Sequence, residues 1–138
     1  MENQCVFCKI IAAEIPSATI YEDEDFKVIM DIAPAAKGHA IILPKKHFAN
    51  LYEMDDDTAS KALIVARKVA IAIKAELGCE GMNLLQNNGE LAGQTVFHFH
   101  MHLIPRKQED GVTFTWKQGS YEEGEAAKVA EAIAKKIK

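Results

Sequence analysis

Short apolar runs separated by turn residues dominate the first two thirds of the chain, and they predict five β-strands. The runs are rich in β-branched and aromatic residues, and glycine, proline or acidic residues bound them. The expected strands cover residues 18–22, 26–31, 39–43, 82–86 and 96–104. Pro44 and Pro105 are expected to end the third and fifth strands, because proline cannot donate a hydrogen bond to a neighbouring strand.

Three segments have the apolar periodicity of helices. A short helix is expected from Cys5 to Ile15, since a proline follows it. The clearest helix runs from about Asp57 to Leu77, with Gly78 placed to end it. A final helix is expected from about Glu122 to Ile137, whereas residues 106–121 show no assignable pattern. The expected apolar stripes are Ala59, Leu63, Ala66, Ala70, Ile73 and Leu77 in the long helix, and Ala126, Val129, Ala130, Ile133 and Ile137 in the last one.

This order of strands and helices predicts an α+β fold in which the long helix covers the sheet. At 138 residues, with 49% hydrophobic and 26% charged residues, the chain is expected to form a single domain over residues 1–138. Its 16 basic and 20 acidic residues give a net charge of −4, which disfavours nonspecific nucleic-acid binding. No run is long and apolar enough for a membrane span, and three cysteines are too few for a disulfide framework, so we expect a cytoplasmic protein.

The fifth expected strand contains three histidines at alternate positions: His98, His100 and His102. Side chains alternate between the two faces of a strand, so the three imidazoles are expected to share one face and the apolar residues between them the other. Burying one imidazole without a partner costs about 1–3 kcal/mol, which makes such a row an expensive way to fill a core. One face is therefore expected to pack and the other to carry chemistry.

Two kinds of chemistry fit this row. Adjacent histidines of the row could bind one metal ion, as in a His-x-His zinc hydrolase. The Cα atoms of the outer two lie roughly 13 Å apart, which makes it difficult for all three to bind a single ion. The loop of residues 87–95 offers the second: its glycines and polar side chains could cradle a phosphate, although a plain turn is the alternative. A neutral imidazole whose other nitrogen donates to a carbonyl would then attack the phosphorus.

The segment His98-Phe99-His100-Met101-His102-Leu103-Ile104 resembles the His-φ-His-φ-His-φ-φ motif of the histidine triad (HIT) superfamily, where φ is apolar. The resemblance extends over roughly residues 5–106, through Ala92–Val96, Pro105-Arg106, Asp31-Ile32 and Gly38–His47. It implies a HIT-like fold, with an antiparallel sheet of about five strands packed with a long central helix and a C-terminal helix. It also implies a homodimeric enzyme that cleaves nucleoside 5′-phosphate derivatives, of a purine nucleotide above all, at the α-phosphorus.

The resemblance assigns roles to individual residues. His100 would be the nucleophile and would carry a nucleotidyl intermediate. His102 and the Gln94-Thr95 segment would hold the α-phosphate with help from Asn87, and His98 would support the site's geometry. Asp31 would bind the ribose, although a turn residue is its plainer interpretation, and Phe7 and Ile10 are core residues by default. The expected nucleotide-binding set is Phe7, Ile10, Ile29, Asp31, Ile32, Asn87, Gly93, Gln94, Thr95 and Val96.

The Cys5-x-x-Cys8 pair has the spacing of half a structural zinc site, although residues three apart also share one face of an ordinary helix. The resemblance to bacterial-type relatives implies that His47 and His98 complete the site, with one structural zinc per chain that the chemistry does not require. Cys79 is expected to be a small, half-buried residue. His39 could support the histidine row or lie on the surface.

A nucleoside phosphoramidate hydrolase is thus the leading hypothesis. A dinucleoside polyphosphate hydrolase of the same superfamily is an alternative, because the Pro105-Arg106-Lys107 continuation resembles that branch. A nucleotide-binding regulatory module with incidental turnover and the His-x-His metal hydrolase are the other two.

Overall fold

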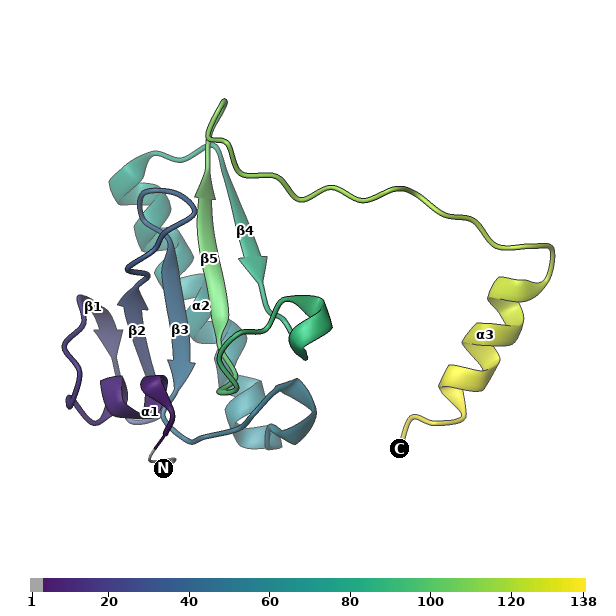
Figure 1. Cartoon of the computed structure of the whole chain (residues 1–138), viewed down its shortest axis with the longest axis horizontal. Helices are drawn as coiled ribbons and strands as arrows, with labels where there is room; N and C mark the ends of the chain where they lie inside the picture. The colour runs from purple at the N-terminus through teal and green to yellow at the C-terminus, as the bar shows by residue number, and fades with distance from the viewer. Residues whose placement is uncertain (1–3) are drawn as a thin grey trace.

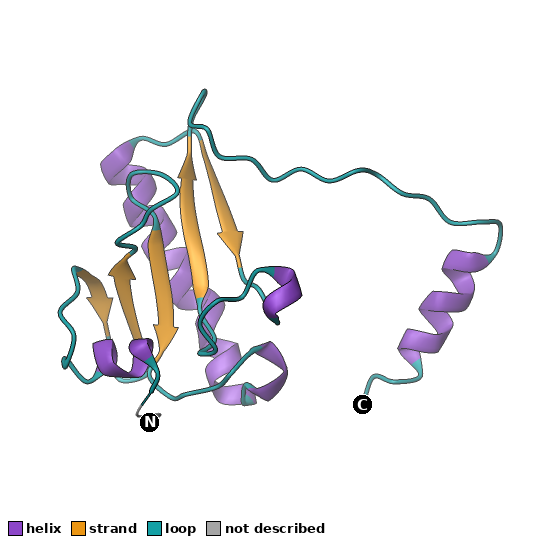
Figure 2. Ribbon diagram, in the orientation of Figure 1, coloured by secondary structure: helices purple, strands orange, loops and turns teal. Residues whose placement is uncertain are grey.

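The computed structural model describes residues 4–138 and contains one five-stranded antiparallel sheet (Figures 1 and 2). The strands lie in the order β1-β2-β3-β5-β4, so β4 forms one edge of the sheet and β1 the other. The predicted α+β class is confirmed. The strands are β1 (Thr19–Glu22), β2 (Phe26–Met30), β3 (Ala40–Pro44), β4 (Gly81–Leu85) and β5 (Met101–Arg106).

Helices cover both faces of this sheet unequally. The long helix α2 (Asp56–Leu77) lies across one face, and the short helix α1 (Val6–Ile11) packs on the other. Two short 3-10 helices, η1 (Leu51–Glu53) and η2 (Glu90–Ala92), lie in the loops before α2 and before β5. No helix between residues 4 and 138 is long and apolar enough to cross a membrane.

Strand alternation divides the apolar residues into two clusters. Met101 and Leu103 of β5 point to the α2 side and join the larger cluster. His102, between them, lies opposite Ile41 of β3, and Ile41 belongs to the smaller cluster under α1. The expected division between a packing face and a histidine face is therefore present in β5.

The histidine strand itself differs from the prediction at both ends. It begins at Met101, not at residue 96, because the preceding segment leaves the sheet and the Phe99 N–H donates to the carbonyl of Phe48 (2.6 Å). It continues through Pro105, which was expected to end it. Pairing with β3 stops at Leu103, so beyond that point β5 has only β4 beside it and a missing N–H is tolerated there.

Helix α2 has the expected ends but not the expected stripe. The side chain of Asp55 accepts a hydrogen bond from the Thr58 N–H (2.8 Å), and Gly78 ends the helix with a φ of 62°. The buried positions are Thr58, Ala62, Val65, Ala66, Val69 and Ile73. The stripe prediction was wrong for Ala59, Leu63 and Leu77, which are exposed, because α2 is apolar on more than one side and the position of the sheet decides which side is covered.

The two terminal helices also differ from expectation. Helix α1 ends at Ile11 instead of Ile15, and Ala13 adopts a left-handed φ of 62° that a helix cannot continue through. Residues 107–138, here called the arm, leave the rest of the described chain, here called the body, after Arg106. The arm runs without strand or helix to α3 (Glu125–Ala134), which has no buried residue and lies apart from the sheet (Figure 1).

Candidate active site and metal centre

His100 has one ring nitrogen committed and the other available. Its Nδ1 lies 2.7 Å from the carbonyl oxygen of His98, and a carbonyl can only accept, so Nδ1 carries the proton. Nε2 of the neutral ring then bears a lone pair. The Phe7 ring packs against the imidazole in a T-shaped arrangement, with centroids 4.9 Å apart. This is the arrangement that a nucleophilic imidazole requires.

A chain of hydrogen bonds sets the opposite state in His102. The Ala35 N–H donates to Nδ1 of His39 (2.9 Å), so the proton of His39 is on Nε2. That Nε2 lies 2.8 Å from Nδ1 of His102 and donates to it, which leaves the proton of His102 on its own Nε2. His100 and His102 lie side by side, with ring centroids 4.9 Å apart. One ring therefore offers a lone pair and its neighbour a hydrogen-bond donor.

Burial keeps these rings neutral. Desolvation lowers the pKa of His100, and it lowers the pKa of His102 to about 4 together with the neighbouring His100 and His39. Burial also lowers the pKa of His39, against the effect of the Asp31 carboxylate 3.5 Å from its Nε2. At neutral pH the lone pair of His100 is thus not lost to protonation. We refer to Asp31, His39, His100 and His102 as the reacting cluster.

The reacting cluster opens onto a cavity of about 310 Å³ on the α1 side of the sheet. His100, His102 and Asp31 lie at one part of its wall, and apolar side chains from α1, β2 and β3 form much of the remainder. Phe7, Ile10 and Ile29 line the cavity and also belong to the smaller core cluster, so each is a core residue and a cavity residue at once. Ile32, Thr95 and Val96 also line the cavity, as do Val6, Ile15, Pro16, Ser17, Met30 and Ile41, which the sequence reasoning did not single out.

The loop before β5 is braced from within. The side chain of Gln94 is buried, donates to the carbonyls of Ala49 (2.7 Å) and Val96 (3.0 Å), and accepts from the Gly89 N–H (2.8 Å). The side chain of Asn87 lies beside Gly93, whose φ of 101° favours glycine. Asn87, Gly93 and Gln94 are not among the residues lining the cavity. Gln94 therefore holds the shape of the loop, while Thr95 and Val96 face the cavity.

A second cluster consists of Cys5, Cys8, His47 and His98, and is here called the metal cluster. Nδ1 of His98 lies 3.5 Å from the sulfur of Cys5, 3.5 Å from the sulfur of Cys8 and 3.1 Å from Nδ1 of His47. The Cys8 sulfur is 3.3 Å from Nδ1 of His47. All four donor atoms lie within 4.8 Å of one another.

These distances fit tetrahedral zinc. Bonds of about 2.3 Å to sulfur and about 2.0–2.1 Å to nitrogen separate neighbouring ligand atoms by roughly 3.3–3.8 Å. The ring of His98 is prepared for such an ion, because its Nε2–H donates to the Pro44 carbonyl (2.8 Å) and leaves Nδ1 unprotonated toward the two sulfurs. Burial lowers the pKa of His98 to about 4, which keeps that nitrogen free of a second proton.

The His-x-His metal hypothesis does not fit this geometry. Within residues 4–138, no group of converging donor atoms contains two of the three triad histidines: His98 belongs to the metal cluster, and His102 to a group with Asp31 and His39. His39 was left open between a supporting and a surface position, and it is 5% exposed and bonded to His102. The register that pairs β3 with β5 brings it there, and no local pattern in the sequence indicates it.

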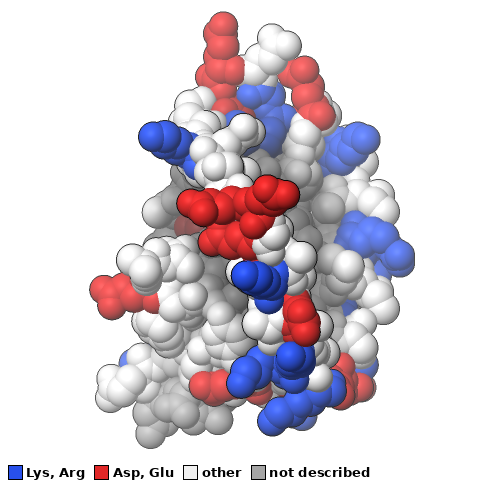
Figure 3. All heavy atoms as spheres, turned by 90° about the vertical axis from the view of Figure 1, so that its right-hand side faces the viewer, with Lys and Arg blue, Asp and Glu red and all other residues white. Residues whose placement is uncertain are grey.

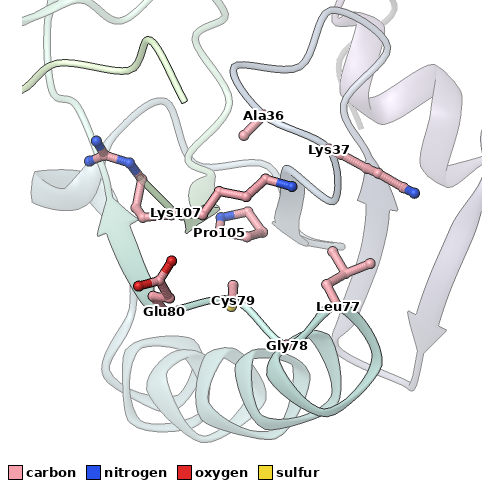
Figure 4. Close-up of a pocket in the computed structure, with 9 residues that line it drawn as sticks. Ala36, Lys37, Leu77, Gly78, Cys79, Glu80, Pro105 and Lys107 are labelled. Carbon is pink, nitrogen blue, oxygen red and sulfur yellow. The ribbon is translucent and has the colours of Figure 1, made fainter. Parts of the chain in front are cut away.

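A second hollow lies at the end of α2 and has a different character (Figure 4). Its lining includes the apolar side chains of Leu77 and Pro105, the thiol of Cys79 and the side chains of Lys37 and Lys107. None of its lining residues is a histidine. The cavity beside the reacting cluster is therefore the better candidate for an active site.

Comparison with known proteins agrees with this architecture. The HIT domain family model matches residues 12–109, so the chain belongs to the HIT family. "Protein hit" of Bacillus subtilis is 44% identical over 138 residues, covering 98% of this chain and 95% of that protein. The adenosine 5′-monophosphoramidase hnt1 of Schizosaccharomyces pombe is 38% identical over 135 residues, covering 97% and 98%.

A crystal structure of a HIT family member from Bacillus subtilis superposes with a TM-score of 0.94 at 44% identity, covering 99% of both chains. The arm makes up about a quarter of this chain, so such a score requires the arm of the two proteins to superpose as well as the body. The arm's position is therefore shared with a solved relative. The family model itself ends at residue 109, close to the start of the arm.

Proposed function

We propose that this protein is a nucleoside phosphoramidate hydrolase that works through a nucleotidyl-histidine intermediate on His100. One observation carries the proposal: a buried, neutral His100 whose Nδ1–H is held by a backbone carbonyl while its ring lines an open cavity. Relatives named as adenosine 5′-monophosphoramidases support the substrate class. The general class, a nucleotide hydrolase, agrees with the family.

The chemistry would proceed in two displacements at the α-phosphorus. The lone pair on Nε2 of His100 forms an N–P bond, the bond to the leaving nitrogen breaks, and that nitrogen takes a proton from solvent and departs as an amine. Water then attacks the same phosphorus, the N–P bond to His100 breaks, and a nucleoside monophosphate is released. Nε2–H of His102 would donate to a phosphate oxygen and offset the negative charge that develops in each step.

The rest of the cavity would hold the nucleoside. Asp31 would accept hydrogen bonds from the ribose hydroxyls, since a carboxylate presents two oxygens to a diol. Phe7, Ile10 and Ile29 would contact a flat base with their apolar surfaces, as the largely apolar lining permits. A purine nucleotide is the proposed partner for this slot.

Zinc is proposed for the metal cluster as a structural ion. When bound, it would join the N-terminal segment to His47 and His98 and so hold one side of the reacting cluster in place. The protein's own residues carry all the chemical steps. We also propose a homodimer, because α2 exposes Leu63 (63%) and Ile71 (62%) and the edge strand β4 exposes Leu84 (47%).

The function is tested by mixing the purified protein with an adenosine phosphoramidate and measuring both steady-state release of AMP and intact-protein mass within the first turnovers. We expect steady turnover and a transient mass increase equal to one adenylyl group. A nucleotide-binding module would bind without a comparable rate, and preferred cleavage of dinucleoside polyphosphates would favour the alternative hydrolase. Turnover without any adduct, under conditions that trap intermediates, would contradict covalent catalysis.

A further inference from the structure

The arm exposes apolar side chains that the body does not cover. In α3, Val129 is 40% exposed, Ile133 58% and Ile137, just beyond it, 75%. Before the helix, Trp116 is 80% exposed and Tyr121 65%. Large aromatic and β-branched residues contribute most of the free energy of burial in folded proteins, and a set of this size on one segment marks a contact surface.

The helix in the arm also needs a surface to be stable. A helix of ten residues is marginal in water, because isolated helices shorter than about 12–15 residues rarely persist. Figure 3 shows acidic and basic side chains together on the side of the molecule where the arm lies. Within α3, Glu125 in the first turn complements the helix dipole, but no basic residue lies in the last turn. This effect is screened and small at an exposed site, so packing of the apolar stripe must supply most of the stability.

The start of the arm directs it away from its own body. Nε of Arg106, the last residue of β5, donates to Asp110 (2.7 Å), and the same guanidinium donates to the Val112 carbonyl (2.7 Å). Arg106 is also held by Asn83 of β4 (2.8 Å). These bonds fix the direction in which the chain leaves, and Figure 1 shows it extending outward on the β4 side, with α3 well separated from the sheet.

The body presents a matching surface on that same side. Strand β4 is an edge of the sheet and exposes Leu84, and Ile71 of α2, which is 62% exposed, lines a shallow hollow together with Gly81 and Met82 of β4. An edge strand flanked by exposed apolar residues is a surface that another chain can cover. A second copy seated against β4 would lie between the body and α3 of the first.

We propose that the arm is exchanged: in a dimer formed on the β4 side, α3 of each chain packs its apolar stripe against the body of the other copy. The inference rests on the homodimer of the proposed function and goes beyond it, since it assigns the arm to the partner. A two-fold dimer pairs the same surfaces reciprocally, so one geometry places both arms. A stable interface buries roughly 1,200–2,000 Å² in total, and two arms with their exposed aromatic residues would add to the area of the β4 contact.

Crosslinking of mixed dimers tests the exchange. Full-length protein labelled with ¹⁵N is mixed with unlabelled protein until the subunits redistribute, and lysines are then crosslinked and identified by mass spectrometry. We expect crosslinks between Lys128 of α3 or Lys135 at its C-cap and lysines of the body to join labelled to unlabelled chains in the proportion that random mixing gives. Crosslinks of α3 to the body confined to one isotope would overturn the exchange, because they show an arm folded back on its own chain.

Two variants sharpen the result. Ile133→Asp places a charge on the apolar stripe and should raise the dimer dissociation constant about tenfold or more, measured by sedimentation at a series of dilutions. Lys128→Asp places the same aspartate on the opposite side of α3 and should change it little. Neither position is buried, so both variants should keep the thermal transition of the body.

The other possible results of these measurements separate the arm exchange from the homodimer. A dimer in which Ile133→Asp has no effect and the amides of α3 exchange as fast as an unfolded peptide contradicts the exchange but leaves the homodimer standing. A monomer at all accessible concentrations contradicts both. The adenylyl adduct on His100 is measured separately and reports on the proposed chemistry in either case.

Discussion

Two clusters of polar side chains lie at either end of one short stretch, His98 to His102, and they differ in what surrounds them. The metal cluster encloses its donor atoms: His98 is 0% exposed, and its Nδ1 faces two sulfurs and a second imidazole. The reacting cluster faces a cavity, and its histidines bond to the backbone and to each other. In each cluster a backbone carbonyl fixes the tautomer of one histidine. The Pro44 carbonyl accepts from His98 in the metal cluster, and the His98 carbonyl accepts from His100 in the reacting cluster.

The difference shows that the environment, not the residue type, assigns a role to a histidine. Three identical side chains at alternate positions present a nitrogen that faces two sulfurs, a lone pair over a cavity and a hydrogen-bond donor, because their second nitrogens have different partners. The two clusters should therefore respond differently to mutation. One set of changes should remove chemistry and leave the metal, and the other should remove the metal and stability first.

The largest effect is expected for His100→Ala. Loss of the nucleophile should lower kcat by about 10³-fold or more and abolish the adenylyl adduct. Bound zinc, measured by metal analysis of the purified protein, should stay at the wild-type level because His100 is outside the metal cluster. Wild-type turnover in this variant would refute the assignment of the nucleophile.

Cys8→Ser should have the largest effect on stability. Cys8 is 1% exposed, and its sulfur lies 3.3–3.5 Å from both histidines of the metal cluster, so the change should remove zinc and lower Tm by about 10 °C. Activity of the protein that remains folded should fall by much less than in His100→Ala. Cys79→Ser makes the same chemical change outside the cluster and is the matched control. Equal metal content and Tm in Cys8→Ser and wild type would contradict the metal site.

His39→Asn should weaken turnover without touching the metal. Without the donor from His39, His102 is no longer held with its proton on Nε2, and kcat should fall by about 10- to 100-fold with little change in KM. His47→Asn is the companion variant on the other cluster, and it should lose zinc instead. A change in KM alone after His39→Asn would assign His39 to substrate binding and contradict its positioning role.

The smallest effect is expected at Asp55, outside both clusters. Its hydrogen bonds to Thr58 and the nearby Lys46 lower its pKa to about 2 from 3.8, so the charged cap stabilises the folded protein above pH 4 and loses its effect as the pH falls toward 2. Asp55→Asn keeps an oxygen acceptor without the charge. The difference in Tm between wild type and this variant should thus be greatest near neutral pH and vanish toward pH 2. Zinc content and kcat near neutral pH should not change.

Much of the body can be predicted from sequence because local signals and burial agree there. Turn residues bound four of the five strands within about a residue or two, and Gly78 ends α2 as expected. The histidine strand was misplaced at both ends, because its first half is held by Phe48 and its last part continues beside β4 after β3 has stopped. The ends of this strand are set by residues far away in the chain, and a local sequence pattern does not contain that information.

The candidate site was predicted from the sequence only in part. The histidine row and the Cys-x-x-Cys pair are visible as patterns, and the family resemblance connected them with His47 and Asp31. The partners that set the protons, such as the Pro44 carbonyl for His98 and His39 for His102, were not predictable from any spacing. They meet only because the antiparallel register of β3 and β5 brings distant residues together.

By itself the sequence determined the fold class, the alternation that separates histidines from packing residues, and the family to which the chain belongs. Only the tertiary structure decided which nitrogen of each histidine carries a proton, which side of α2 is buried, and that the last helix leaves the body. The physical reason is the range of the interactions. Periodicity and capping act over a few residues and are written locally, whereas hydrogen-bond partners and burial depend on surfaces that meet only after the sheet has formed.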